Sequence, residues 1–221
     1  TPNLGWLLLG SVLSATLVNA GPLATNLLAN TAVEKDLAAG FATGVLVARV
    51  PLFLFQAVQA ALLPKLARLA AQGAYDEFRA GFRKLMVVVM GVCVLGTVGA
   101  AVIGPFAVDI AFNEKLGRRT LTLLALASGL YMVAMAIAQA LIALHGHAKV
   151  AWGWALGMVA FVVVTAIAGS DLLLRVELGL VAASVAALAF FGYALRSELR
   201  SGAQPDTESL LVALHEVPLE P

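Results

Sequence analysis

The most restrictive feature of this chain is the spacing of its charged residues. No Asp, Glu, Lys or Arg occurs before Glu34, and later gaps of 24, 29, 21 and 18 residues separate consecutive charges. A helix needs about 20 predominantly apolar residues to cross a bilayer. Charged residues make up 12% of the chain and apolar residues 61%, so too few charges remain to cover a water-facing surface. We therefore expect an integral membrane protein.

The apolar stretches predict an all-α polytopic membrane protein, a bundle of six transmembrane helices. The alternation of apolar and polar residues that marks a membrane barrel is absent. Residues 1–196 are expected to form the six-helix lobe, and residues 197–221 a cytoplasmic, mostly disordered tail that contains Pro205 and several acidic residues. The predicted helices cover residues 5–30, 37–63, 85–108, 120–144, 150–170 and 173–195.

One basic segment predicts the orientation of the bundle. Residues 65–84 carry five basic residues and place Phe78, Phe82 and Leu85 at helical spacing, the pattern of an amphipathic helix at a membrane surface. Because basic loops remain in the cytoplasm, this segment is assigned to that side. With six spans, both chain ends are then cytoplasmic, and the expected location is the cytoplasmic (inner) membrane.

Composition and motifs exclude several classes of function. A net charge of +1 gives no reason to expect nucleic acid as a partner. The single Cys93 has no partner for a disulfide, and His145 and His147 fit an interfacial turn better than a metal site. No phosphate-binding loop, zinc motif or catalytic triad is recognisable. We expect no enzymatic activity, no cofactor and no metal.

Arg49 is the charged residue that falls well inside a predicted span. It lies 12 residues after Leu37, about 18 Å along a helix and therefore near the middle of the bilayer. A charge at that depth costs at least about 2.5–3.5 kcal/mol, so it must face protein or a water-filled cavity. It is either a structural arginine, paired with a carboxylate or with backbone carbonyls, or a binding residue for an anionic ligand. Because the central parts of the predicted spans contain no carboxylate, we favour the ligand.

Polar side chains follow the same faces of the first two predicted helices. Gln56 falls within about 20° of Arg49 on a helical wheel, and Gln59 is adjacent to that face. Asn19 and Asn26 share a face of the preceding helix, and a Gly-Pro pair between them removes a backbone hydrogen bond and kinks the helix. Such residues either hold helices together or line a cavity. The predicted substrate-binding residues are Arg49, Gln56, Gln59, Asn19 and Asn26.

The second predicted helix and the loop after it carry a family resemblance. Gly40–Gly73 reads GFATGVLVARVPLFLFQAVQAALLPKLARLAAQG, with an Arg before a Pro- and Phe-rich turn and an LLPK sequence before the basic segment. Asn19–Ala29 reads NAGPLATNLLA. These stretches resemble the eighth and the kinked seventh helix of the multidrug/oligosaccharidyl-lipid/polysaccharide exporter superfamily. The resemblance covers about residues 1–195, with its recognisable motifs in the first 75, and is to flippases of lipid-linked oligosaccharides or lipid II.

The resemblance implies a C-terminal lobe whose N-terminal partner lobe lies outside this chain. In such transporters two lobes rock around a central cavity. The implied function is to flip a polyprenyl-diphosphate-linked saccharide for cell-surface polysaccharide or cell-wall synthesis, with Arg49 at the position of an arginine that contacts the substrate phosphate. The implied partners are this anionic substrate, membrane lipids and the other lobe. Two alternatives stay open: a cation-coupled multidrug exporter of the same fold, and a non-transporting scaffold with a dry core.

Overall fold

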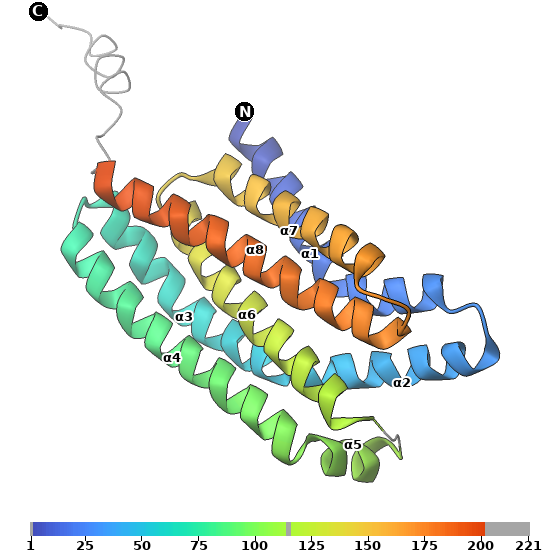
Figure 1. The fold of residues 1–221 in the computed structure, drawn as a ribbon. Coiled ribbons are helices and arrows are strands. Elements are labelled where there is room, and N and C mark those ends of the chain that lie inside the picture. Colours follow the sequence, from blue (N-terminus) through green and yellow to red (C-terminus); the bar gives the residue numbers. More distant parts are fainter. Residues whose placement is uncertain (1, 114–115, 202–221) are drawn as a thin grey trace, which may run out of the picture.

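The computed structural model describes residues 2–113 and 116–201, without the side chains of residues 2, 3, 54, 57–59, 61–63 and 201. Six helices in these ranges are long and apolar enough to cross a membrane, which confirms the all-α polytopic bundle. Figure 1 shows them packed as one bundle. Including the shorter pieces into which some spans are divided, the described residues form α1 (Pro2–Leu28), α2 (Ala32–Ala48), α3 (Val50–Ala71), α4 (Tyr75–Val102), α5 (Gly104–Phe112), α6 (Arg118–Ala143), α7 (His147–Ile167) and α8 (Leu172–Ser201).

Two of the six predicted helices are interrupted. The helix predicted over residues 37–63 is divided at Arg49 into α2 and α3, and the one predicted over residues 85–108 is divided at Ile103 into α4 and the short α5. A proline lies in the first turn of each new helix, Pro51 in α3 and Pro105 in α5. Proline has no backbone N–H and suits the start of a helix, so each interruption falls just before one.

The separate surface helix predicted over residues 65–84 is not formed. The helix α3 extends to Ala71, and α4 begins at Tyr75 after a tight turn in which Gly73 has a φ of +68°. The amphipathic pattern instead buries Phe78 and Leu85 within the bundle. Residues 197–201 of the predicted tail belong to α8, and residues 202–221 lie outside the described residues.

The helix α6 lies at the centre of the bundle. Two thirds of its most apolar stretch (67%) is buried, against 17% for α4. Beside it, Trp154 of α7 lies between Tyr131 of α6 and Phe191 of α8, with ring centres 5.0 Å apart in both pairs. Small residues allow the close crossings, because Gly129 contacts Cys93 of α4 and Gly153 contacts the Phe191 ring. Glycine and alanine have this role between membrane helices.

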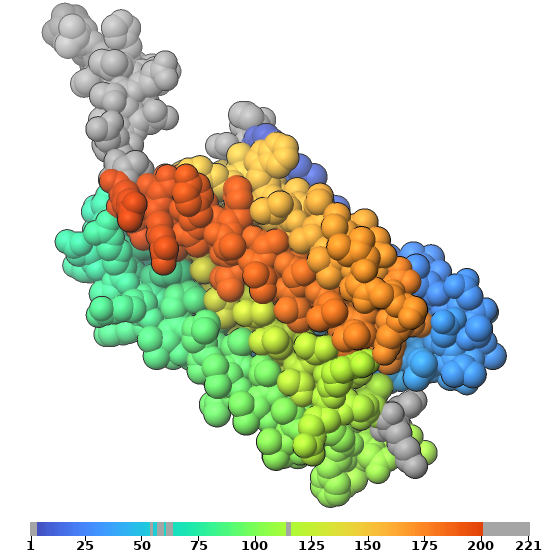
Figure 2. All heavy atoms as spheres, in the orientation of Figure 1, coloured from blue at the N-terminus to red at the C-terminus, as the bar shows by residue number. Residues whose placement is uncertain are grey.

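The outer face of α4 is apolar and uncovered. Figure 2 shows α4 and α8 on the face turned toward the viewer, with the end of α1 and α2 projecting at one side. Large apolar side chains, such as Leu95 with 74% of its surface exposed, follow one another along this face of α4. Such a row is unusual on a protein in water and suits contact with lipid tails. The large exposed apolar residues of α4 are Val87, Val88, Met90, Val94, Leu95, Val98 and Val102.

Candidate functional site

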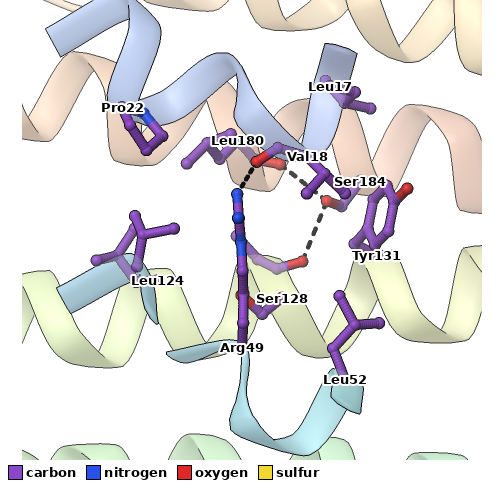
Figure 3. A pocket seen from close by; sticks show the side chains of 12 residues that line it. Leu17, Val18, Pro22, Arg49, Leu52, Leu124, Ser128, Tyr131, Leu180 and Ser184 are labelled. Carbon is purple, nitrogen blue, oxygen red and sulfur yellow. Dashed lines mark hydrogen bonds between the residues drawn. The ribbon is translucent and has the colours of Figure 1, made fainter. Parts of the chain in front are cut away.

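Arg49 lies at the junction of two helices. Its backbone ends α2 and starts α3, with φ −90° and ψ −7°. The proline two residues later cannot donate a backbone hydrogen bond, so the ladder of helical bonds is broken at this point. The side chain leaves the junction toward α1, as Figure 3 shows. Local sequence therefore places a half-buried guanidinium beside α1, on a short turn.

A second proline supplies the acceptor for that guanidinium. In a regular helix the N–H of residue 22 would bond to the carbonyl of Val18, but Pro22 has no N–H. Arg49 Nη2 donates to this Val18 oxygen, and Nη1 lies 3.5 Å from Oδ1 of Asn19. Of the two partners expected for a structural arginine, a carboxylate or a backbone carbonyl, the structure shows the backbone carbonyl.

A small cavity surrounds this contact. Its volume is about 40 Å³, and its walls come from α1, α2, α3, α6 and α8. Val18, Tyr131 and Ser184 line it and lie near the midpoints of α1, α6 and α8, so the cavity lies at mid-height in the bundle. The lining residues are Leu17, Val18, Pro22, Val45, Arg49, Leu52, Leu124, Ala127, Ser128, Tyr131, Leu180 and Ser184.

Two of the polar groups in the cavity wall already have partners. The Ser184 hydroxyl is 2.9 Å from the carbonyl oxygen of Leu180 and 3.2 Å from that of Ala127. Tyr131 donates to the carbonyl of Ser14 at 3.2 Å. Arg49 forms no ion pair with any carboxylate of the described residues. Its positive charge is therefore met only by neutral dipoles.

The structure brings together part of the predicted site. Arg49 and Asn19 are neighbours, although Asn19 is exposed and does not line the cavity. Asn26 is exposed as well and donates to the carbonyl of Pro22 in its own helix at 2.8 Å. Gln56 is exposed and does not line the cavity. Its predicted alignment with Arg49 assumes one continuous helix, and the interruption at Arg49 removes that alignment. The side chain of Gln59 lies outside the described residues.

A buried carboxylate was not singled out by the sequence. Glu177 of α8 is 0% exposed, although it lies near the start of a predicted span. A helical wheel would have identified it, because Leu173, Leu180 and Ser184 share its face and point into the bundle. The carboxylate lies near Arg119 and Asp171, at the end of the bundle where α6 and α8 begin.

Neither a metal-ligand cluster in the described part of the chain nor a known relative is found for this site. Among the described residues, no group of three or more His, Cys, Asp or Glu side chains is placed to hold a metal ion. A scan against family models, a search of curated proteins and a search of solved structures give no match.

Proposed function

We propose that this chain is one lobe of a membrane transporter that flips a polyprenyl-diphosphate-linked saccharide across the cytoplasmic membrane by alternating access. The observation that carries the proposal is the charge of Arg49, which lies at mid-height in an apolar bundle without an ion-pair partner among the described residues. Charged residues at this depth are costly and usually serve substrates or ions. An anionic ligand would neutralise the charge.

The chemistry of the guanidinium fits a diphosphate. Its planar N–H groups form paired, charge-assisted hydrogen bonds with phosphate oxygens, which are about twice as strong as bonds to neutral acceptors. The Val18 carbonyl and the Asn19 amide are neutral acceptors and hold the side chain in place until a stronger one arrives. Arg49 is thus poised to exchange weak partners for a phosphate.

The size of the cavity requires that binding be accompanied by opening. About 40 Å³ accommodates one or two water molecules and no diphosphate. Arg49 is half-buried and Asn19 is exposed, so a phosphate can approach the guanidinium from the exposed side. To enclose it, α1 must separate from the junction of α2 and α3, which would also break the contacts of Arg49 with Val18 and Asn19. In the proposed cycle the described arrangement is the closed one, and a partner lobe outside this chain completes the site.

The direct test is Arg49→Ala in the complete protein, with flipping of a lipid-linked saccharide or surface export as the readout. Loss of a charge-assisted interaction is expected to reduce transport at least about tenfold, and Arg49→Lys is expected to retain part of it. Gln72→Ala, on an exposed residue in the turn between α3 and α4, is the control. Unimpaired export of Arg49→Ala at normal protein levels would remove the assigned role.

A non-transporting scaffold is the second candidate. It is favoured by the hydrogen bonds of Arg49 to Val18 and Asn19, since a static, dry bundle also requires such internal bonds. Cysteines introduced at positions 19, 49 and 56, in a background without Cys93, distinguish the two by their reaction with a water-soluble maleimide. Labelling of position 49 from either side of the membrane supports transport, and protection of positions 19 and 49 from both sides supports the scaffold.

A further inference from the structure

Glu177 is a fully buried acid with an unusual environment. The residue is 0% exposed and its carboxyl oxygens lack well-aligned hydrogen bonds, the Thr120 hydroxyl and Arg119 being the donors that act on them. The hydroxyl oxygen of Thr165, in the neighbouring α7, is also buried without a partner. An ionised carboxylate is expected to accept several hydrogen bonds when it is removed from water. The surroundings of Glu177 therefore suit a neutral acid better than an anion.

One guanidinium is shared between two acids at this end of the bundle. Arg119 Nε is 3.6 Å from Oε2 of Glu177, and Nη2 of the same arginine donates to Asp171 at 3.2 Å. The other nearby cation, Arg175, directs its Nε to the carbonyl of Thr165 at 2.7 Å. The charged groups that act on Glu177 are thus Arg119 and Asp171. One positive charge cannot balance two buried or half-buried anions.

Asp171 is the acid that retains its negative charge. It lies just outside the membrane-spanning part of α8, is half exposed, and accepts a hydrogen bond from the backbone N–H of Leu174 at 3.0 Å. This N–H, together with Arg119, lowers the pKa of Asp171 below its usual value. Two acids that compete for one cation titrate as a coupled pair, and the more buried member binds the proton.

We propose that Glu177 is a proton-binding site, protonated while α6, α7 and α8 are closed around it and ionised when this end of the bundle opens to water. The ligand is a proton rather than a metal cation, because the Arg119 guanidinium at 3.6 Å repels a second positive charge. Rising pH then favours the open arrangement. The inference is independent of which substrate is carried.

The test is the thermal stability of the complete protein in detergent as a function of pH. In the unaltered protein the melting temperature is expected to fall as pH rises from mildly acidic to alkaline, because ionisation of Glu177 opposes the closed packing. E177Q, which mimics the protonated acid, is expected to remove this fall. D171N is expected to reduce it, because Arg119 is then free to neutralise an ionised Glu177. D76N, on a residue whose side chain is 98% exposed, is the control and keeps the profile unchanged.

Two results would overturn the proposal. One is an E177Q variant that keeps the original pH dependence. The other is an E177Q variant less stable than the unaltered protein at every pH, which is the behaviour of an ionised acid paired with Arg119. If E177Q does not fold, dicyclohexylcarbodiimide, a lipid-soluble reagent for protonated carboxyl groups, is applied to the unaltered protein. Labelling of Glu177 that declines with rising pH supports the site, and absence of label at acidic pH contradicts it.

Discussion

The guanidinium of Arg49 donates a hydrogen bond to the carbonyl oxygen of Val18, 31 positions earlier in the chain. Pro22 leaves that oxygen without its helical donor, and Pro51 accompanies the helix interruption from which the arginine extends. Pro22 in α1 therefore frees the acceptor, and Pro51 in α3 accompanies the interruption that places the donor beside it. The contact joins α1 to the junction of α2 and α3 at mid-height in the bundle.

Pro22→Ala is expected to uncouple α1 from Arg49. The new N–H can bond to the Val18 carbonyl, so the guanidinium loses its main acceptor. A double-mutant cycle of Pro22→Ala with Arg49→Gln, measured as free energy of unfolding in mixed micelles, is expected to give a coupling of about 1–3 kcal/mol. The same cycle with Asn26→Ala in place of Pro22→Ala serves as control, with a coupling below about 0.5 kcal/mol. Equal couplings in the two cycles would contradict the assigned contact.

Gly153→Ala is expected to destabilise the packing of α7 against α8. A methyl group at this position would lie 2.0 Å from a ring carbon of Phe191, which is fully buried and cannot move aside freely. Overpacking of this kind costs about 1–3 kcal/mol in unfolding free energy. Gly192→Ala, with no atom within 4 Å of the added methyl, is expected to be neutral or stabilising by up to about 1 kcal/mol. Equal stability of the two variants would show that the crossing is looser than described.

Leu95→Arg tests whether the outer face of α4 meets lipid. The side chain is 74% exposed, and on a water-facing surface its replacement would change stability by at most about 0.5 kcal/mol. In the bilayer interior the arginine is expected to cost about 2.5–3.5 kcal/mol of insertion free energy, measured with a translocon insertion reporter. Gln72→Arg, in the turn between α3 and α4, is the control without effect. Normal insertion of Leu95→Arg would place this face away from lipid.

Asp171→Ala is expected to lower stability at neutral pH and to have little effect in acid. The carboxylate accepts the Leu174 N–H at the start of α8, and its pKa lies below the usual value. Its stabilisation is therefore complete above the usual pKa of an aspartate and is lost as pH falls through the pKa in the folded protein. The expected loss at neutral pH is about 0.5–2 kcal/mol, the usual effect of removing such a cap. Unfolding free energies at several pH values measure it, and a difference that persists in strong acid would contradict it.

The number of membrane-spanning helices could be predicted from the sequence because charged residues delimit them. Lys149 and Asp171, for example, bracket the apolar stretch of α7, because charged residues favour the ends of a membrane span over its interior. Pro51 predicts a bend just after Arg49, but not the division of the helix into α2 and α3. Proline within an apolar run either kinks a helix or begins a new one, and the surrounding packing decides between them.

Individual site residues were harder to predict than the helices that carry them. A helical wheel says which residues share a face, but not which neighbouring helix covers that face. This is why Asn19 meets Arg49 while Gln56 does not, although both residues are exposed and outside the cavity. The same limit applies to Glu177, whose depth depends on how far α6 and α7 extend around it.

The proline-linked weak points at Pro22 and Arg49 have a mechanical consequence. The last part of α1 and the whole of α2 run side by side at one side of the bundle (Figure 1). They stay attached along their length, because Phe41 and Val45 belong to the main core and Ala38 packs with Leu172 of α8. Bending at Pro22 or Arg49 breaks no further helical bond, since one is already missing there. Tilting of residues 23–48 must therefore separate side-chain packing rather than backbone bonds, and it would pull the guanidinium away from the carbonyl that holds it.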